Sequence, residues 1–217
     1  MFRRIFFLMI LSMTCGWIFS QSLSEIYLHF SEDELKVPME VRHKMIYNKG
    51  NTLINYDGYS LKVYDKRAKF IQVITPLKHI YEIAIWKLNK KDILVALCET
   101  DDGSAKQSVL HFFLPQQNWK EVPASEYIPE FSLDDIFSAK KLEKNYLTIK
   151  TLLPDFQVKT QFFLPQSGHD IIVVFTCLDE LEKSDFKRIY KYLDGTMLDL
   201  EWTKEKFVKG PAYFLVN

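Results

Sequence analysis

The clearest pattern along the chain is an alternation of apolar and polar positions through its middle. Five segments rich in β-branched and aromatic residues follow one another across short polar gaps, namely 61–65, 69–75, 81–88, 92–100 and 108–114. A period of two predicts β-strands. Because the gaps leave no room for crossover helices, consecutive strands have to pair antiparallel, as a meander. The alternation within 81–88 predicts one buried face and one face that is either wet or covered by helices.

The segment before the meander carries helical signals instead. Residues 22–25 and 31–34 both read Ser-x-x-Glu, the spacing of a capping box, in which the hydroxyl and the carboxylate bind free amides of a first helical turn. Proline at position 38 suits the first turn of a third helix, which we expect over 38–47 with Gly50 as its stop. The sequence therefore predicts short N-terminal helices followed by a sheet.

A second set of strands is predicted after a proline-containing break at 115–130. These strands are 145–152, 156–164 and 170–178. The motif Phe-Phe-Leu-Pro-Gln occurs at the end of a predicted strand on both sides of the break, at 112–116 and at 162–166. One interpretation is that two similar β lobes derive from one unit; the other is chance, since apolar strand ends followed by proline are common.

The last predicted helix covers 184–194. Ser184 is its expected cap, its apolar residues recur at helical spacing, and Gly195 occupies the position of a left-handed C-cap. A strand over 197–202 then ends at Trp202. Ser132 followed by Asp135 predicts one capped helical turn earlier in the chain.

Together these elements predict an α+β fold with one or two antiparallel meanders, short N-terminal helices and one late helix. The 217 residues are 47% hydrophobic and 15% aromatic, which suits a packed core and argues against disorder. We expect residues 21–217 to form a single domain, with two lobes meeting near 115–130 as the alternative.

Residues 1–20 have the layout of a secretory signal peptide. Arg3 and Arg4 precede an apolar run over 5–19, and Ser20 offers a small residue for cleavage. The run is shorter than the roughly 20 residues that span a bilayer. A retained anchor and a lipoprotein acylated at Cys15 are the alternatives. We expect export to the periplasm or the outer surface, with no membrane span after cleavage.

The charge balance argues against a nucleic-acid partner. The chain has 28 basic and 28 acidic residues, and loss of Arg3 and Arg4 leaves 26 against 28, a net charge of about −2. A nucleic-acid binder shows a basic patch or a strongly basic domain. That class is excluded.

Two cysteines remain after processing, Cys98 and Cys177, both in apolar strand-like runs. Two buried thiols that behave as small hydrophobes are the first interpretation. A Cys98–Cys177 disulfide is the second, because exported chains can form disulfides. Their spacing matches no metal motif.

The usual catalytic motifs are missing from the sequence, including G-x-S-x-G, H-E-x-x-H, the Walker loop and G-x-G-x-x-G. No two histidines have the spacing of helical metal ligands, so we predict no catalytic residue, metal ligand or cofactor. His111 lies in a predicted strand. His169 adjoins Asp170 in a turn, where the pair could support acid–base chemistry or simply be solvated.

Trp119 is the candidate binding residue. Aromatic residues at strand positions, such as Trp86, usually belong to a core. Trp119 instead lies in the proline-bounded connection, where packing alone explains a large aromatic residue less well.

Two short segments carry a family resemblance. Residues 118–123 read NWKEVP after the first strands, and 200–202 read LEW after the last helix. The order resembles small exported proteins of Bacteroidales-type bacteria, domain-of-unknown-function family 3256, which has a D-W-x-E-L-P-like segment and a late tryptophan at these places. Asn118 replaces the commoner acid. The resemblance implies export and an α+β fold, and it supplies no activity, cofactor or functional residue.

These observations favour an exported, non-enzymatic binding or accessory protein of the periplasm or cell surface. Its partner would be an envelope protein or a small ligand. The alternatives are an exported hydrolase whose site is assembled from distant residues, and a structural lobe of a larger envelope assembly.

Overall fold

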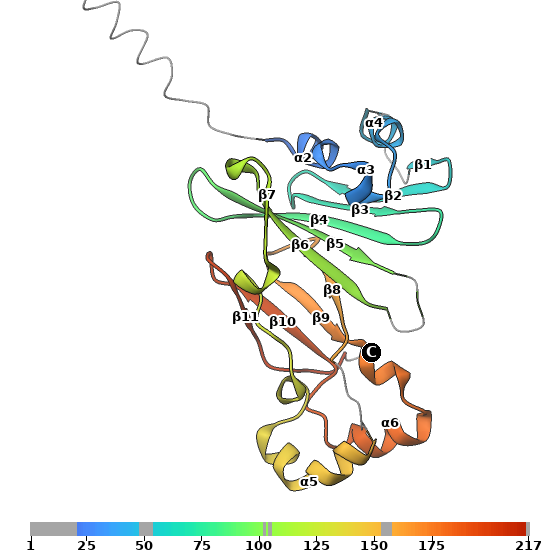
Figure 1. The fold of residues 1–217 in the computed structure, drawn as a ribbon, viewed down its shortest axis with the longest axis vertical. Coiled ribbons are helices and arrows are strands. Elements are labelled where there is room, and N and C mark those ends of the chain that lie inside the picture. The colour runs from blue at the N-terminus through green and yellow to red at the C-terminus, as the bar shows by residue number, and fades with distance from the viewer. Residues whose placement is uncertain (1–20, 48–53, 102, 104–105, 153–157, 216–217) are drawn as a thin grey trace, which may run out of the picture.

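A computed structural model describes residues 21–47, 54–101, 103, 106–152 and 158–215. It contains two antiparallel sheets, one of seven strands in the order β1 to β7 and one of four strands in the order β11-β10-β9-β8. We call them the first and second sheets. The N-terminal helices cover one face of the first sheet, the second sheet lies on its other side, and two further helices lie at the far end (Figure 1). The predicted α+β class is confirmed. The predicted signal peptide at 1–20 lies outside the described residues.

The first sheet is the predicted meander, extended by one short strand at each edge. Its strands are β1 (Ile54–Tyr56), β2 (Tyr59–Asp65), β3 (Phe70–Ile74), β4 (Ile80–Lys87), β5 (Ile93–Thr100), β6 (Ser108–Leu114) and β7 (Lys120–Val122). The β1–β2 turn places Asp57 at φ 51° and Gly58 at φ 82°. Two consecutive positive φ angles are typical of the tight hairpin turns that match strand twist.

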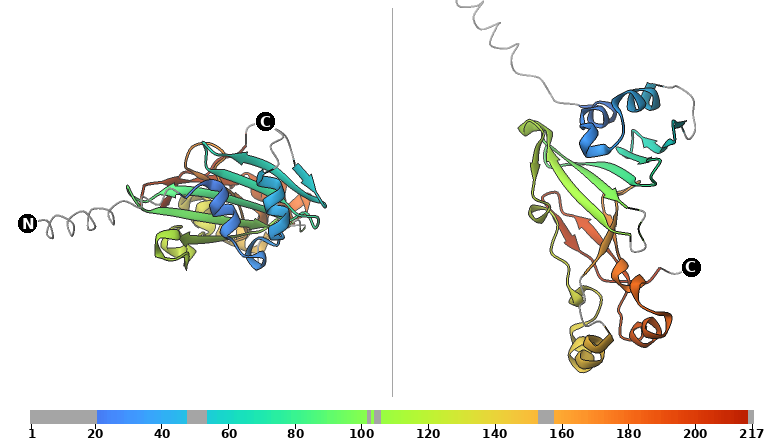
Figure 2. Two further views of the ribbon diagram at one scale, coloured as in Figure 1. Left: turned by 90° about the horizontal axis from the view of Figure 1, so that it is seen from above. Right: turned by 45° about the vertical axis from the view of Figure 1, so that its right-hand side comes forward.

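The three predicted N-terminal helices form as α2 (Leu23–His29), α3 (Glu32–Leu35) and α4 (Met39–Tyr47). Both capping boxes are complete: in the second, Glu34 N donates to Ser31 Oγ at 3.2 Å and Ser31 N donates to Glu34 Oε2 at 2.6 Å. Seen from above, these helices lie across the strands of the first sheet (Figure 2). Arg42 is fully buried among them and donates to the carbonyls of Tyr27 and Phe30 at the end of α2. A positive charge there interacts favourably with the negative end of the helix dipole.

The second sheet consists of β8 (Thr160–Phe163), β9 (Ile171–Phe175), β10 (Met197–Trp202) and β11 (Phe207–Lys209). Short 3-10 turns connect the elements, at η1 (Pro115–Gln117), η2 (Ala124–Glu126), η3 (Leu133–Asp135) and η4 (Thr176–Glu180). The predicted Ser132–Asp135 capping pair forms at η3. Each Phe-Phe-Leu-Pro-Gln copy spans the end of a strand, β6 for 112–116 and β8 for 162–166. Their origin from one unit stays a prediction.

The predicted strand at 145–152 is wrong, because these residues belong to helix α5 (Ala139–Leu152). The helix starts upstream in a run rich in alanine, lysine and leucine, which are strong helix formers. Ile149 is buried, Leu142 packs partly against the core two turns earlier, and Leu147 is 79% exposed. That spacing is helical, and alternation over 145–152 alone imitates a strand.

The late helix is α6 (Lys183–Tyr190), which is capped at Glu182 instead of Ser184. It lies beside α5 at the end of the molecule away from α2 (Figure 1). Gly195 is not its left-handed C-cap, since the helix ends at Tyr190. A Cβ on Gly195 would lie 2.2 Å from Tyr213 N, so glycine is needed there for close approach of two backbone segments.

Strand β4 is buried on both faces. Its residues Tyr81, Ile83 and Ile85 belong to the cluster formed with the N-terminal helices, whereas Ala84 and Trp86 belong to the cluster formed with the second sheet. The sequence predicts that one face of 81–88 is either wet or covered by helices. In the structure the helices cover it. Trp86 also donates from Nε1 to the His169 carbonyl at 2.7 Å, which joins the two sheets.

Polar side chains of the first sheet bind the free edge of β8. Leu164 N, just after β8, donates to Glu82 Oε2 at 2.9 Å, and Phe162 N donates to Ser108 Oγ at 3.0 Å. Gln72 Nε2 donates to the other Glu82 oxygen at 2.7 Å. Burial raises the pKa of Glu82, which is only 3% exposed.

Candidate functional site

Trp119, the residue singled out from the sequence, packs against the N-terminal helices. Its ring stacks on His29 with a centroid distance of 4.0 Å and meets Phe30 edge-on at 5.6 Å. Asn118 and Trp119 both have positive φ, which turns the chain from β6 into β7. Trp119 therefore fastens this turn to the end of α2 and stays partly exposed.

The two histidines considered in the sequence lie at separate places. His111 Nδ1 lies 2.7 Å from Glu121 Oε1 on the neighbouring strand β7, and both side chains are well exposed. His169 is exposed in the turn before β9. Asp170 accepts from Trp202 N at 2.9 Å, so its carboxylate fixes the end of β10.

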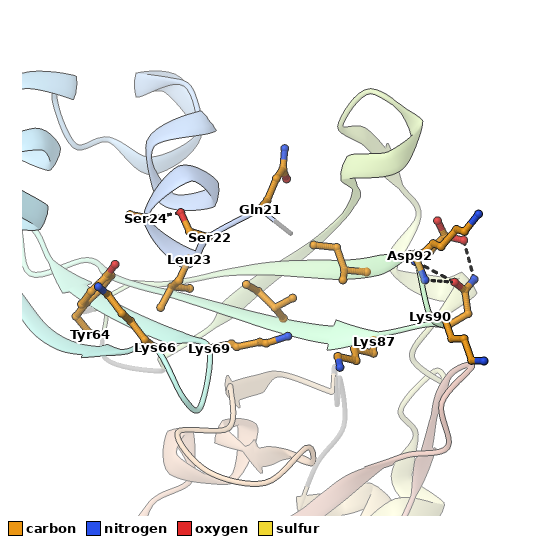
Figure 3. Close-up of a pocket in the computed structure, with 14 residues that line it drawn as sticks. Gln21, Ser22, Leu23, Ser24, Tyr64, Lys66, Lys69, Lys87, Lys90 and Asp92 are labelled. Atoms are coloured by element: carbon orange, nitrogen blue, oxygen red, sulfur yellow. Dashed lines mark hydrogen bonds between the residues drawn. The ribbon is translucent and has the colours of Figure 1, made fainter. Parts of the chain in front are cut away.

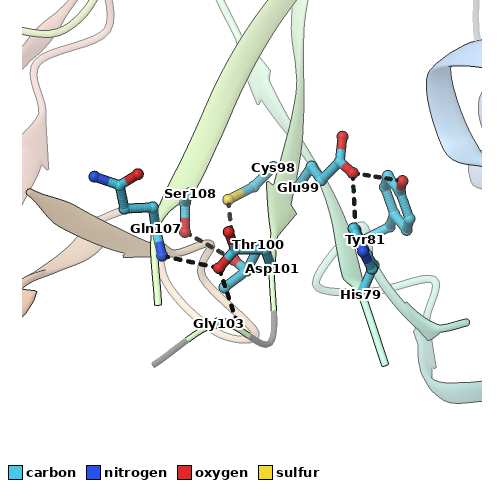
Figure 4. Close-up of polar contacts among 9 residues, drawn as sticks. All are labelled: His79, Tyr81, Cys98, Glu99, Thr100, Asp101, Gly103, Gln107 and Ser108. Atoms are coloured by element: carbon cyan, nitrogen blue, oxygen red, sulfur yellow. Dashed lines mark hydrogen bonds and ion pairs between the residues drawn. The ribbon is translucent and has the colours of Figure 1, made fainter. Parts of the chain in front are cut away.

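Cys98 and Cys177 are both free and buried, so the disulfide alternative is not realised in this structure. Cys98 Sγ lies 4.0 Å from Thr100 Oγ1 (Figure 4). It also lies 3.7 Å from the Phe162 carbonyl. Burial raises the pKa of the Cys98 thiol to about 12 and also raises the pKa of Cys177. Thiols that stay protonated and enclosed are poor nucleophiles.

The structure assembles one polar cluster that the sequence did not indicate. Glu99 Oε1 accepts from the Tyr81 hydroxyl at 2.8 Å and lies 3.1 Å from His79 Nδ1 (Figure 4). Burial raises the pKa of Tyr81, which keeps its hydroxyl a donor. Tyr81 and Glu99 are direct partners across β4 and β5, so finding the cluster required the strand register. Within the described ranges, no group of three or more His, Cys, Asp or Glu side chains could hold a metal ion.

A cavity of about 470 Å³ opens at one end of the first sheet, on the helix-covered face. Its walls come from residues 21–24 at the start of α2, the β2–β3 turn, the end of β4 and residues 89–93 at the β4–β5 turn (Figure 3). Its volume is in the range of small-molecule sites. We call it the lysine pocket.

Five lysines line the pocket, namely Lys66, Lys69, Lys87, Lys90 and Lys91. Asp92 is the acid in the lining, and its carboxylate accepts from Asn89 Nδ2 at 2.6 Å. Across the described ranges, no ion pair joins any of these lysines to an acid. Burial, and then the charge of Lys87, lower the pKa of Lys69. The pocket lining therefore holds five lysines and the Asp92 carboxylate, an excess of positive charge.

The local sequence explains why these ammonium groups have no acidic partner among the described residues. In the β2–β3 turn, Asp65 Oδ1 accepts from the amides of Arg67 at 2.7 Å and Ala68 at 2.9 Å. In the β4–β5 turn, the Asn89 side chain accepts from the amides of Lys91 at 2.8 Å and Asp92 at 2.9 Å. The short polar side chains are thus engaged with their own turns.

Apolar side chains form the floor of the pocket. Leu23 points from the start of α2 toward the sheet, above Lys69 and Lys87 (Figure 3). Ile85 and Ile93 complete the floor from β4 and β5. The arrangement can bind an anion by charge and hold an attached apolar group against the floor.

A second, more open cavity of about 420 Å³ lies beside β11. It is lined by residues 125–129 and 206–209 and carries charges of both signs, with Lys209 already paired to Asp135 at 2.7 Å. It has no comparable excess of one charge, so the lysine pocket is the better candidate.

Comparison with known proteins establishes the fold alone. No family model matches the chain, and no curated protein matches it. It is similar to a solved domain of an uncharacterized protein from Porphyromonas gingivalis W83, with 16% identity and a TM-score of 0.69 over 87% of this chain and 97% of that domain. That organism belongs to the Bacteroidales, the group named by the sequence resemblance. Among the helices that the structure describes, none is both long and apolar enough to cross a bilayer.

Proposed function

We propose that the chain is an exported, non-enzymatic binding domain of the periplasm or cell surface, and that the lysine pocket binds an anionic ligand. One observation carries the proposal: five lysines without acidic partners among the described residues surround a cavity with an apolar floor. Clustered charge of one sign at a concave surface attracts and concentrates the opposite charge.

The chemistry of the lining favours small anions of varied shape. Lysine is a compact point charge with rotatable donors, whereas arginine imposes a planar, bidentate geometry. Among the described residues, the basic side chains that line the pocket are lysines and not arginines. Phosphate, carboxylate and sulfonate groups therefore all fit the recognition chemistry.

Export is supported by the layout of residues 1–20 and by the resemblance to domain-of-unknown-function family 3256. Cleavage after Ser20 would keep all the pocket residues named above. The location is tested by cell fractionation of the tagged chain, with mass spectrometry of its N-terminus. A chain that stays in the cytoplasm with residues 1–20 intact would contradict export.

Binding is tested on residues 21–217 with pyrophosphate, a hydrophilic polyanion, followed by isothermal titration at rising salt. The pocket variant is Lys69→Glu with Lys87→Glu. The matched control is Lys140→Glu with Lys144→Glu, which makes the same charge change on exposed positions of α5. We expect the pocket variant to weaken binding at least tenfold and the control to change it less than twofold. Equal loss in both variants, or no binding at all, would contradict the proposal.

An exported hydrolase is the alternative function. The cluster of His79, Tyr81 and Glu99 favours it, because a carboxylate that orients an imidazole is a common acid–base arrangement. Hydrolysis of a chromogenic ester that disappears in His79→Ala, with pyrophosphate binding intact, would support the hydrolase.

A further inference from the structure

The charged and apolar side chains of the lysine pocket alternate on neighbouring strands. On β4, Ile83, Ile85 and Lys87 follow one another on the helix-covered face, because side chains two apart share a face. Lys87 pairs directly with Ile93 on β5. Directly opposed residues have Cβ atoms only about 4.5–5.5 Å apart. A charged site and an apolar site are thus immediate neighbours.

The same alternation occurs between β3 and β4. Phe70 pairs with Ala84, so the position before Phe70, Lys69, falls beside Ile85. Leu23 at the start of α2 faces these strands from the other side of the pocket and is 6% exposed. The aliphatic stems of Lys69 and Lys87 add further apolar surface beneath their ammonium groups.

From this alternation, and resting on the proposed function, we infer that the ligand is a single-chain amphiphilic anion. Its phosphate or carboxylate head would lie between Lys69 and Lys87, and its apolar chain would lie on Leu23, Ile85 and Ile93 beneath α2. Leu23 and Ile85 are already buried and Ile93 is partly exposed, so an alkyl chain would remove mainly Ile93 and the lysine stems from water. A purely hydrophilic anion would leave them wet. The pocket volume of about 470 Å³ favours a single molecule over a bilayer surface.

The test is a series of monoalkyl phosphates titrated calorimetrically below their micelle concentrations. The probes are inorganic phosphate, butyl, hexyl and octyl phosphate, with octanol as the uncharged control. Burial of one methylene group contributes about 0.8 kcal/mol, so each buried methylene should tighten binding up to about fourfold. We expect stepwise tightening that levels off once the cavity is full, and weak binding of octanol.

Two variants test separately the binding of the ligand's head group and of its alkyl chain. Lys69→Gln with Lys87→Gln should weaken every phosphate by a similar factor. Ile93→Thr, which keeps a β-branched residue in β5, should reduce the gain per methylene and leave inorganic phosphate unaffected. Thermal unfolding of both variants checks that they remain folded.

Each outcome bears on a different statement. If neither pyrophosphate nor any member of the series binds, the proposed function fails. If pyrophosphate and inorganic phosphate bind but chain length has no effect, this inference fails and the proposed function stands. Binding to phosphatidylglycerol vesicles without binding of the monomers would also overturn the inference, in favour of a membrane surface.

Discussion

The two faces of the first sheet are covered in different ways. On one face, α2, α3 and α4 pack through apolar side chains such as Ile26, Leu35 and Val41. On the other face, the second sheet packs against aromatic side chains such as Trp86 and Phe112. It also meets two polar side chains, the buried Glu82 and the half-buried Ser108.

The difference follows from the backbone of each cover. The free amides at the starts of α2 and α3 are bound by their own capping boxes, so these helices meet the sheet through apolar contacts. Strand β8 is the last strand of its sheet, so half of its amides face away from β9 and need other partners. Glu82 and Ser108 supply them. The second sheet, which covers this face, therefore requires polar side chains on the first sheet.

The largest effect is expected from Trp86→Ala, on the face that meets the second sheet. The substitution removes a fully buried indole and its bond to the His169 carbonyl, and it should cost about 3–5 kcal/mol in the free energy of unfolding. Trp86→Phe is the control, since it keeps most of the apolar volume and loses the bond. Urea unfolding measures both, and a loss below about 1 kcal/mol for Trp86→Ala would show that the sheets pack loosely.

The next effect concerns the polar contacts of the same face. Glu82→Ala leaves Leu164 N and Gln72 without their acceptor and should cost about 1–3 kcal/mol. Glu82→Gln keeps an acceptor for Leu164 N and should lose much less. If both variants unfold at the same urea concentration, the carboxylate is not holding β8.

Glu82 also predicts a dependence on pH. Its pKa is raised in the folded state above the ordinary value of 4.5, so the folded state binds the proton more tightly than the unfolded state. Its contribution to stability is therefore full below the unfolded pKa and is lost as pH rises through the folded pKa. The stability of Glu82→Gln relative to the wild type should increase with pH from 4 upward. Urea unfolding at several pH values measures this difference, and a flat difference would contradict the shift.

A smaller effect is expected on the helix-covered face. Ser31→Ala removes one half of the α3 capping box and should cost about 1 kcal/mol. Hydrogen exchange should locate the change in α3 and α4 and leave β9 and β10 protected. Equal loss of protection in both sheets would mean that the helices and the second sheet unfold as one unit.

The smallest effect is expected at the pocket. Lys69→Gln removes a partly buried charge that lies near Lys87, and it should stabilise the protein by less than about 0.5 kcal/mol. Thermal unfolding at low and high salt measures it, because salt screens the repulsion and should shrink the gain. A clear destabilisation would indicate that Lys69 already has a stabilising partner.

The features predicted correctly from the sequence depend on local patterns. The strands of the meander alternate visibly, and the two capping boxes need residues only three apart. The prediction that Gly195 is a C-cap is wrong, because the contact that requires glycine there, with the backbone at Tyr213, is not local in the sequence. The strand predicted at 145–152 failed because alternation over a short window also fits α5.

The candidate pocket could not be predicted for a related reason. Lys69, Lys87 and Leu23 are unremarkable in the sequence, and only the register of β3, β4 and β5 with the placement of α2 brings them together. Trp119 was selected for its loop position, and its stacking on His29 depends on a contact that no local pattern reveals.

The side chains at the free edge of β8 have a consequence for solubility. An open strand edge is a template on which another chain can add a strand, and natural proteins guard against this aggregation. In this protein the first sheet protects the edge of β8, because Glu82 and Ser108 accept hydrogen bonds from the amides of Leu164 and Phe162 that an incoming strand would use. A substitution at either side chain would leave one of these amides unpaired where β8 lies against β5 and β6, and so would weaken the protection of this edge.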